Sequence, residues 1–166
     1  MAKLHLQRNS DTAVEPTQAT TFSACLDIYA DTNNREITVF DSNNIKRVVD
    51  TLLDDLVLQP QERALIPTGW LMQPEEGYAV KFYPRSGCAI KQGLALANCV
   101  GVIDRDYTQE TMLAVINTSG ASATIIHGDR LGQLEVYKVE PIDIELVQEL
   151  PKLVSNRAGG FGSTGV

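Results

Sequence analysis

The sequence predicts an all-β fold, a jelly-roll-like β-sandwich or barrel, because short alternating runs and turn residues fill most of its length. Apolar and polar residues alternate within each run, as in strands with one buried face. Clusters of Gly, Pro and Asp separate the runs, which is typical of tight connections between strands. We expect strands at 78–83, 94–98, 111–117, 133–139 and 142–148.

One segment, 44–55, has a different pattern. Apolar residues recur there at the spacing of one helix face, namely Ile45, Val48, Val49, Leu52, Leu53 and Leu56. Ser42, Asn43 or Asn44 would cap the first turn. We therefore expect a short helix packed on the sheet. Recognition of a partner by this helix is the less favoured interpretation.

Composition excludes several classes of function. The 166 residues include 14 Lys and Arg against 21 Asp and Glu, a formal charge of −7. An acidic chain lacks the basic face that a nucleic-acid backbone requires, so we expect no nucleic-acid partner. No apolar run approaches the ~18 residues of a membrane span, so we expect no membrane partner. Three cysteines without metal-binding spacing indicate reduced thiols, and the start has no signal-peptide core, so we expect a cytoplasmic protein.

The length fits one domain with an appendage, which we place as a β core over 1–155 and a glycine-rich arm over 156–166. The arm is too poor in apolar residues to fold by burial, so we expect it to be flexible. Residues 160–165 match G-x-G-x-x-G, but a dinucleotide fingerprint needs a strand before it and a helix after it. The amides, hydroxyls and Phe161 of the arm suit phosphates and a stacked ring; a tag-like end is the alternative.

Two further segments carry groups for chemistry. Residues 103–107 (IDRDY) place two carboxylates in an expected hairpin. Asp104 and Asp106 share one face of an extended chain, so one can orient water while Arg105 or a turn amide holds the other; a solvated charged turn is the alternative. Residues 84–87 (PRSG) supply a guanidinium, a hydroxyl and a turn amide, which are groups that bind anions.

Taken in order, five segments resemble the five motifs of the trimeric all-β dUTP pyrophosphatases, the dUTPases. They are SACLDIYA at 23–30, PRSGCA at 84–89, NCVGVIDRDY at 98–107, GDRLGQL at 128–134 and GGFGSTG at 159–165. The resemblance implies a jelly-roll-like core and a homotrimer with active sites shared between subunits. It also implies hydrolysis of dUTP to dUMP and pyrophosphate, which limits uracil in DNA and supplies dUMP for dTMP synthesis.

The resemblance assigns nucleoside contacts. Asp104 would activate the water that attacks the α-phosphorus, and Tyr107 would lie under the deoxyribose and disfavour a 2′-OH. The segment from Asn98 to Gly101 would read the uracil edge, and Val102 belongs to the same substrate-binding set.

It also assigns the triphosphate contacts, to Arg85, Ser86, Gly87 and Gln133. In the arm, the resemblance implies substrate contacts, and Phe161 would cover the uracil. The residues are Arg157, Phe161, Gly162, Ser163 and Thr164. Mg²⁺ would be bound by the substrate phosphates without a direct protein ligand, and Asp27 would contact it through water.

The chain departs from the family pattern at four places. Cys25 replaces a glycine, and Thr108 with Gln109 replaces a basic residue and a glycine. Arg157 lies one position closer to the phenylalanine than the family arginine does. The connection 31–57 is roughly twenty residues longer than the fold needs, and an insertion with its own element is often an interface for a protein partner.

Two alternatives to a dUTPase follow from the same resemblance. A dCTP deaminase shares the fold but needs a catalytic glutamate and a different third motif, so IDRDY favours a dUTPase. A non-catalytic trimeric regulatory protein would not require the water-activating Asp104.

Overall fold

The computed structural model describes residues 2–53 and 55–152, which form β-strands and one short π-helix, η1 (Cys88–Gln92). A four-stranded sheet has the order β10 (Gly101–Ile103), β8 (Tyr78–Pro84), β13 (Arg130–Lys138) and β2 (Leu26–Tyr29). A five-stranded sheet has the order β4 (Lys46–Asp50), β3 (Glu36–Phe40), β6 (Arg63–Pro67), β11 (Met112–Asn117) and β9 (Leu94–Leu96). Two further sheets have two strands each. One pairs β1 (Leu4–Arg8) with β7 (Trp70–Pro74), and the other pairs β12 (Ala123–Ile125) with β5 (Leu56–Leu58).

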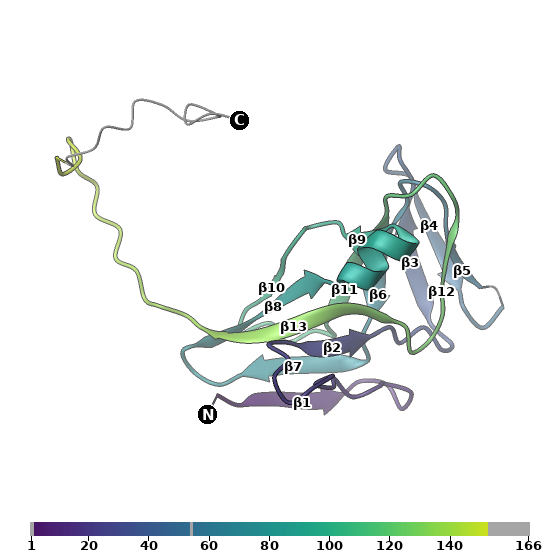
Figure 1. The fold of residues 1–166 in the computed structure, drawn as a ribbon, viewed down its shortest axis with the longest axis horizontal. Coiled ribbons are helices and arrows are strands. Elements are labelled where there is room, and N and C mark those ends of the chain that lie inside the picture. The colour runs from purple at the N-terminus through teal and green to yellow at the C-terminus, as the bar shows by residue number, and fades with distance from the viewer. Residues whose placement is uncertain (1, 54, 153–166) are drawn as a thin grey trace.

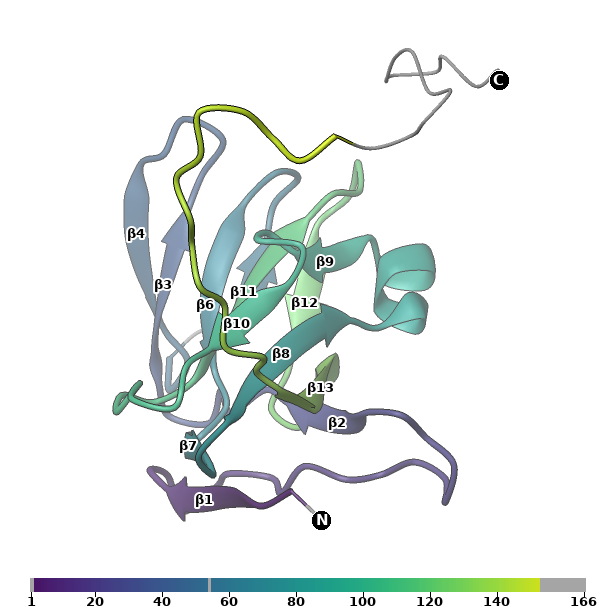
Figure 2. The same cartoon turned by 90° about the vertical axis from the view of Figure 1, so that its left-hand side faces the viewer.

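Figures 1 and 2 show how the strands of the two larger sheets are arranged, and both sheets contribute side chains to one buried cluster. Buried and exposed side chains alternate in the five-stranded sheet: Ile37, Ile66 and Leu113 are buried, and the residues that precede them, Glu36, Leu65 and Met112, are exposed. Full burial of each such side chain contributes about 1.5–3 kcal/mol. The predicted all-β, jelly-roll-like fold is confirmed, and the described strands form open sheets, not a closed barrel. In the described residues no helix is long and apolar enough to cross a membrane.

Four of the five predicted strands are present. Strand β8 corresponds to the prediction at 78–83, β9 to 94–98, β11 to 111–117 and β13 to 133–139. The strand predicted at 142–148 is wrong, because this segment forms no ladder. Its alternating Ile142, Ile144 and Leu146 are all exposed, and the segment extends away from the sheets (Figure 1). Alternation provides the right side chains for a strand, but within the described residues no neighbouring strand pairs with it.

The helix predicted at 44–55 is also wrong: the segment contains strand β4, which forms a hairpin with β3. The Asp41 carboxylate accepts hydrogen bonds from the amides of Asn43 and Ile45, and Asn44 takes a left-handed φ of 65°, so the expected caps form the hairpin turn instead. Val49 is 7% exposed and the adjacent Val48 is 53% exposed, which is the period of a strand. The adjacent β-branched valines fit this strand better than a helix.

The turn between β6 and β7 holds the N-terminal segment against the core. Gly69 has a φ of 76° there, and its carbonyl accepts a hydrogen bond from the Asn9 amide at 2.8 Å. A Cβ at Gly69 would lie 2.4 Å from the Cβ of Ala13 and 2.9 Å from Oδ2 of Asp31. The close approach of these two segments therefore requires glycine at this position.

Replacement of Gly69 by alanine should destabilise the protein more than the same replacement at Gly77. Both glycines have left-handed φ values, but nothing lies within 4 Å of a Cβ built at Gly77. The steric clash at Gly69 should therefore add about 1–3 kcal/mol to the backbone strain that both variants share. Chemical denaturation of Gly69→Ala and Gly77→Ala measures the difference, and equal losses would contradict this packing.

Candidate active site

A buried ion-pair cluster positions Arg85 at the end of β8. Asp27 on β2 is 7% exposed, and its Oδ1 accepts a hydrogen bond from Nε of Arg85 at 2.8 Å. Its Oδ2 is 3.3 Å from Nη1 of Arg130, the first residue of β13. Asp27 therefore holds two guanidinium groups in place, and charge-assisted bonds of this kind fix the orientation of an arginine fork.

The four residues expected to bind phosphates lie together. Arg85, Ser86, Gly87 and Gln133 line one open pocket, which also borders Asp27 and has a volume of about 310 Å³. Gln133 donates from Nε2 to the carbonyl of Pro84 at 3.0 Å, which fixes its side chain beside the end of β8. The pocket combines a guanidinium, a hydroxyl and an amide, and these groups together bind phosphate oxygens.

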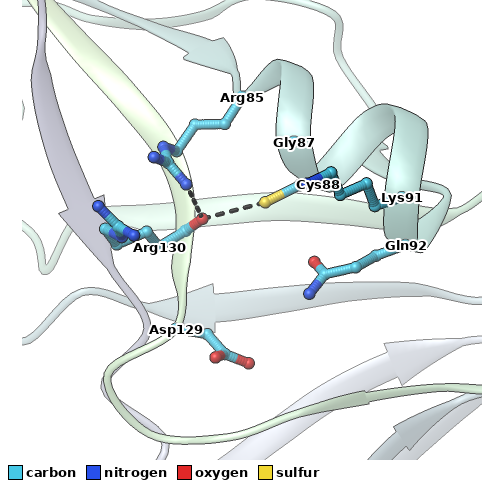
Figure 3. Close-up of a pocket in the computed structure, with 7 residues that line it drawn as sticks. All are labelled: Arg85, Gly87, Cys88, Lys91, Gln92, Asp129 and Arg130. Atoms are coloured by element: carbon cyan, nitrogen blue, oxygen red, sulfur yellow. Dashed lines mark hydrogen bonds between the residues drawn. The ribbon is translucent and has the colours of Figure 1, made fainter.

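A second pocket shares Arg85 and Gly87 with the first and is otherwise lined by residues of η1 and by Asp129 and Arg130 (Figure 3). The Arg130 carbonyl accepts hydrogen bonds from Nη1 of Arg85 at 3.3 Å and from Sγ of Cys88 at 3.0 Å. These bonds connect the start of η1 to the start of β13. Sequence reasoning placed Arg130 in a motif but missed that it shares Asp27 with Arg85; its position directly after the Gly128 turn was the only available signal.

The residues expected to contact the nucleoside lie on and around β10. Gly101 sits opposite Phe82 of β8, and a Cβ built on Gly101 would lie 3.4 Å from both the Phe82 Cβ and Nδ2 of Asn98. A tight turn at Cys99, with a φ of 61°, brings Asn98 over this glycine. The side chain of Val102 is 52% exposed on the same strand. The predicted nucleoside-contact residues Asn98, Gly101 and Val102 therefore lie next to one another in the structure.

Asp104 and Tyr107 follow β10 in an exposed loop. The Tyr107 amide donates to the Asp104 carbonyl at 3.2 Å, and the Tyr107 hydroxyl donates to the Glu110 carbonyl at 3.2 Å. Within the described residues, the Asp104 carboxylate accepts no hydrogen bond, so it remains available to a water molecule. Thr108 and Gln109, where the sequence departs from the family, lie in this loop and are exposed.

The Arg85 pocket and the loop that carries Asp104 do not meet within one chain. In the antiparallel pairing of β10 with β8, Ile103 lies opposite Val80, whereas Arg85 follows the far end of β8. Five residues of strand separate these positions, which is roughly 16 Å. Figure 2 shows the loop after β10 and helix η1 at opposite ends of β8. One copy therefore carries the Arg85 pocket at one end of β8 and the separate Asp104–Tyr107 loop at the other.

The predicted arm residues lie outside the described residues. They are Arg157, Phe161, Gly162, Ser163 and Thr164.

Comparison with known proteins identifies the family. The dUTPase family model matches residues 51–165. The chain belongs to the dUTPase family. A deoxyuridine 5′-triphosphate nucleotidohydrolase of Finegoldia magna is 46% identical over 112 residues, which cover 68% of this chain and 78% of the relative. The corresponding protein of Desulfotalea psychrophila is 42% identical over 112 residues, covering 68% and 74%.

Solved structures agree on the fold. The dUTPase of Staphylococcus bacteriophage 80alpha with dUpNHpp superposes with a TM-score of 0.76 at 22% identity, covering 99% of each chain. A variant dUTPase of phage phi11 of S. aureus, described with a structural Mg(II) ion, has a TM-score of 0.70 at 20% identity and covers 90% of this chain and 99% of that one. At these identities the similarity supports the architecture alone.

Burial should make Cys88 a slow nucleophile. Burial raises the pKa of the Cys88 thiol, an effect that the nearby Arg85 only partly opposes. A raised pKa leaves less thiolate at pH 8, so alkylation should be at least about tenfold slower than in the unfolded chain and should keep rising above that pH. The Cys25→Ser/Cys99→Ser variant isolates this thiol for iodoacetamide labelling in buffer and in denaturant. Equal rates in the two conditions would contradict the burial.

Proposed function

We propose that this protein hydrolyses dUTP to dUMP and pyrophosphate. Membership in the dUTPase family supports this activity, and so do the names of the two relatives above. The observation that carries the proposal is the pocket that brings Arg85, Ser86, Gly87 and Gln133 together around Asp27. That arrangement suits a chain of phosphates on a substrate whose negative charge an acidic protein would otherwise repel.

In the proposed mechanism, Asp104 acts as a general base. Its carboxylate takes a proton from water as the water oxygen bonds to the α-phosphorus. The bond from that phosphorus to the bridging oxygen then breaks, and its electron pair leaves with pyrophosphate. Arg85, Ser86, Gly87 and Gln133 hold the β- and γ-phosphates and stabilise the charge that develops on the leaving group.

We propose that the residues around β10 select the nucleoside. Asn98 and Gly101 read the uracil edge beside Val102, and Tyr107 lies under the deoxyribose. The position of the Asn98 side chain supports this, because its Nδ2 would lie 3.4 Å from a Cβ built on Gly101 and the glycine therefore leaves a compact surface there. Phe161, Gly162, Ser163, Thr164 and Arg157 close over the bound nucleotide in the same proposal, which excludes bulk water.

We propose a homotrimer whose active sites are shared between subunits. The register of β8 and β10 supports this, because Asp104 cannot act on a phosphate held by Arg85 of the same chain. A second copy that brings its 104–107 loop to the Arg85 pocket completes the site. Exposed apolar residues support self-association: Val48, Leu65 and Met112 on the outer face of the five-stranded sheet, and Ile142, Ile144 and Leu146 in the extended segment after β13.

The proposed Mg²⁺ enters with the triphosphate. The described residues contain no group of three His, Cys, Asp or Glu side chains that could hold an ion, and both Asp27 oxygens already accept guanidinium hydrogen bonds. These residues therefore do not fit a protein-held metal. When bound to the phosphates, Mg²⁺ would neutralise part of their charge.

In this proposal, the enzyme acts in the cytoplasm, or in the host cytoplasm if it is phage-encoded. There it would limit uracil in DNA and supply dUMP for dTMP synthesis. The β3–β4 hairpin favours a second role, contact with a protein partner through the 31–57 segment. Its Ile45, Leu52 and Leu53 side chains are exposed, and exposed apolar clusters are typical of interaction surfaces.

Replacing Asp104 by asparagine should abolish most dUTP turnover. Loss of the general base should lower kcat by about 10²- to 10⁴-fold, because asparagine cannot accept the proton from water. Pyrophosphate release from dUTP in Mg²⁺ measures this effect.

The matched control is Asp106→Asn, which changes the other exposed carboxylate of the same loop and should keep near wild-type turnover. Undiminished activity in Asp104→Asn would disprove the mechanism. Ammonia release from dCTP without pyrophosphate release from dUTP would identify a deaminase instead, and no turnover of either by the wild type would favour a regulatory protein.

A further inference from the structure

The carboxylate of Glu110 anchors the loop that carries Asp104 and Tyr107. Its side chain is 10% exposed and lies just before β11. Oε1 accepts a hydrogen bond from the Gly69 amide at 2.9 Å, and Oε2 accepts one from Nδ2 of Asn9 at 2.9 Å. A partly buried carboxylate with several donors has a fixed position, because losing any donor leaves charge unsatisfied.

A charged donor to this carboxylate, Arg35, lies at the base of the β3–β4 hairpin. Nη2 of Arg35 lies 2.5 Å from Oε2 of Glu110, although the two residues are 75 positions apart in the chain. Nη1 of the same guanidinium donates to Oδ2 of Asp31 at 2.9 Å. Arg35 thus bridges two carboxylates with separate nitrogens of one rigid fork, a geometry that lysine cannot reproduce.

The Asp31 end of this bridge is held rigidly. Its side chain is completely buried, and its Oδ1 accepts a hydrogen bond from Oγ1 of Thr12 and lies 3.4 Å from Nδ1 of His127. The Arg35 backbone is fixed too, because its amide donates to Oγ1 of Thr51 and its carbonyl accepts from the same hydroxyl, which closes the hairpin base. Arg35 therefore connects a rigid part of the fold to Glu110.

The Glu110 end leads directly to the proposed sugar contact. The Tyr107 hydroxyl donates to the Glu110 carbonyl, and the Tyr107 amide donates to the Asp104 carbonyl. A displacement of Glu110 therefore moves the Tyr107 ring and the Asp104 carboxylate, which lie in the same loop. A shift of about 1 Å in such a group can cost up to about 100-fold in rate.

We propose that Arg35 is a positioning residue that, through Glu110, sets the Asp104–Tyr107 loop for selection of deoxyribose over ribose. The proposal rests on the function proposed above. In this proposal the β3–β4 hairpin contributes to the active site, because Arg35 at its base supplies the guanidinium that fixes this loop.

The test compares Arg35→Met with Arg47→Met. Arg47 lies on the same hairpin and pairs with the Glu62 carboxylate at 2.7 Å, so the control also removes a guanidinium from a partly buried acid. Arg47 donates hydrogen bonds to Glu62 and to the Val57 carbonyl, neither of which lies in the 104–110 loop. The readouts are the ratio of kcat/KM for dUTP to kcat/KM for UTP, and hydrogen exchange of the 105–111 amides.

Arg35→Met should lower the dUTP/UTP ratio at least about tenfold and speed exchange in 105–111, since a loosened tyrosine discriminates poorly against a 2′-OH. Arg47→Met should leave both readouts within about twofold of wild type. Arg35→Lys should restore only part of the ratio, because an ammonium engages one carboxylate at a time.

An unchanged ratio and unchanged exchange in Arg35→Met would overturn the proposal, and so would equal losses in Arg47→Met. If Arg35→Met does not fold, Glu110→Gln makes the same test, since it breaks the ion pair while Arg35 keeps Asp31. A wild type without dUTP turnover would overturn the proposed function alone, and the exchange measurement would still decide whether Arg35 fixes the loop.

Discussion

The antiparallel pairing of β8 with both β13 and β10 determines where the candidate site residues lie. Pairing with β13 places Gly132 opposite Pro84, which brings Gln133 next to Arg85 and its pocket. Pairing with β10 places Ile103 opposite Val80, so that Asp104 leaves the sheet at the other end of the strand. The same strand thus assembles the Arg85 pocket and separates it from Asp104, and this separation is the basis of the proposal that a second copy completes the site.

Buried carboxylates explain how an acidic protein presents cationic groups to an anionic substrate. Asp27 fixes Arg85 and Arg130, and Asp31 fixes Arg35, whose guanidinium in turn holds Glu110 next to the loop. In each case the acid orients a guanidinium and is itself satisfied by it. The formal charge of −7 is a property of the whole chain, whereas the pocket beside Asp27 locally presents the guanidinium of Arg85.

Local patterns predicted what depends on local chemistry. Alternation located β8, β11 and β13, and the order of the motifs located the pocket residues around Arg85. The same reasoning failed at 44–55, because the valine pair 48–49 and the leucine pair 52–53 fit helical spacing as well as a hairpin, and the Asp41 turn decides between them. The Arg35–Glu110 pair was beyond prediction, since only the β3–β6–β11 pairing brings residues 75 positions apart together.

The central claim, that each active site combines two copies of the chain, is tested most directly by mixing two inactive variants. Arg85→Ala retains a functional Asp104, and Asp104→Asn retains a functional Arg85, so mixed trimers should contain one intact site each. After co-refolding in equal amounts, dUTP turnover should recover to about a quarter of wild type, as expected for random assembly of a cyclic trimer. Turnover no greater than that of the unmixed variants, in a sample shown to contain mixed trimers, would contradict the shared site.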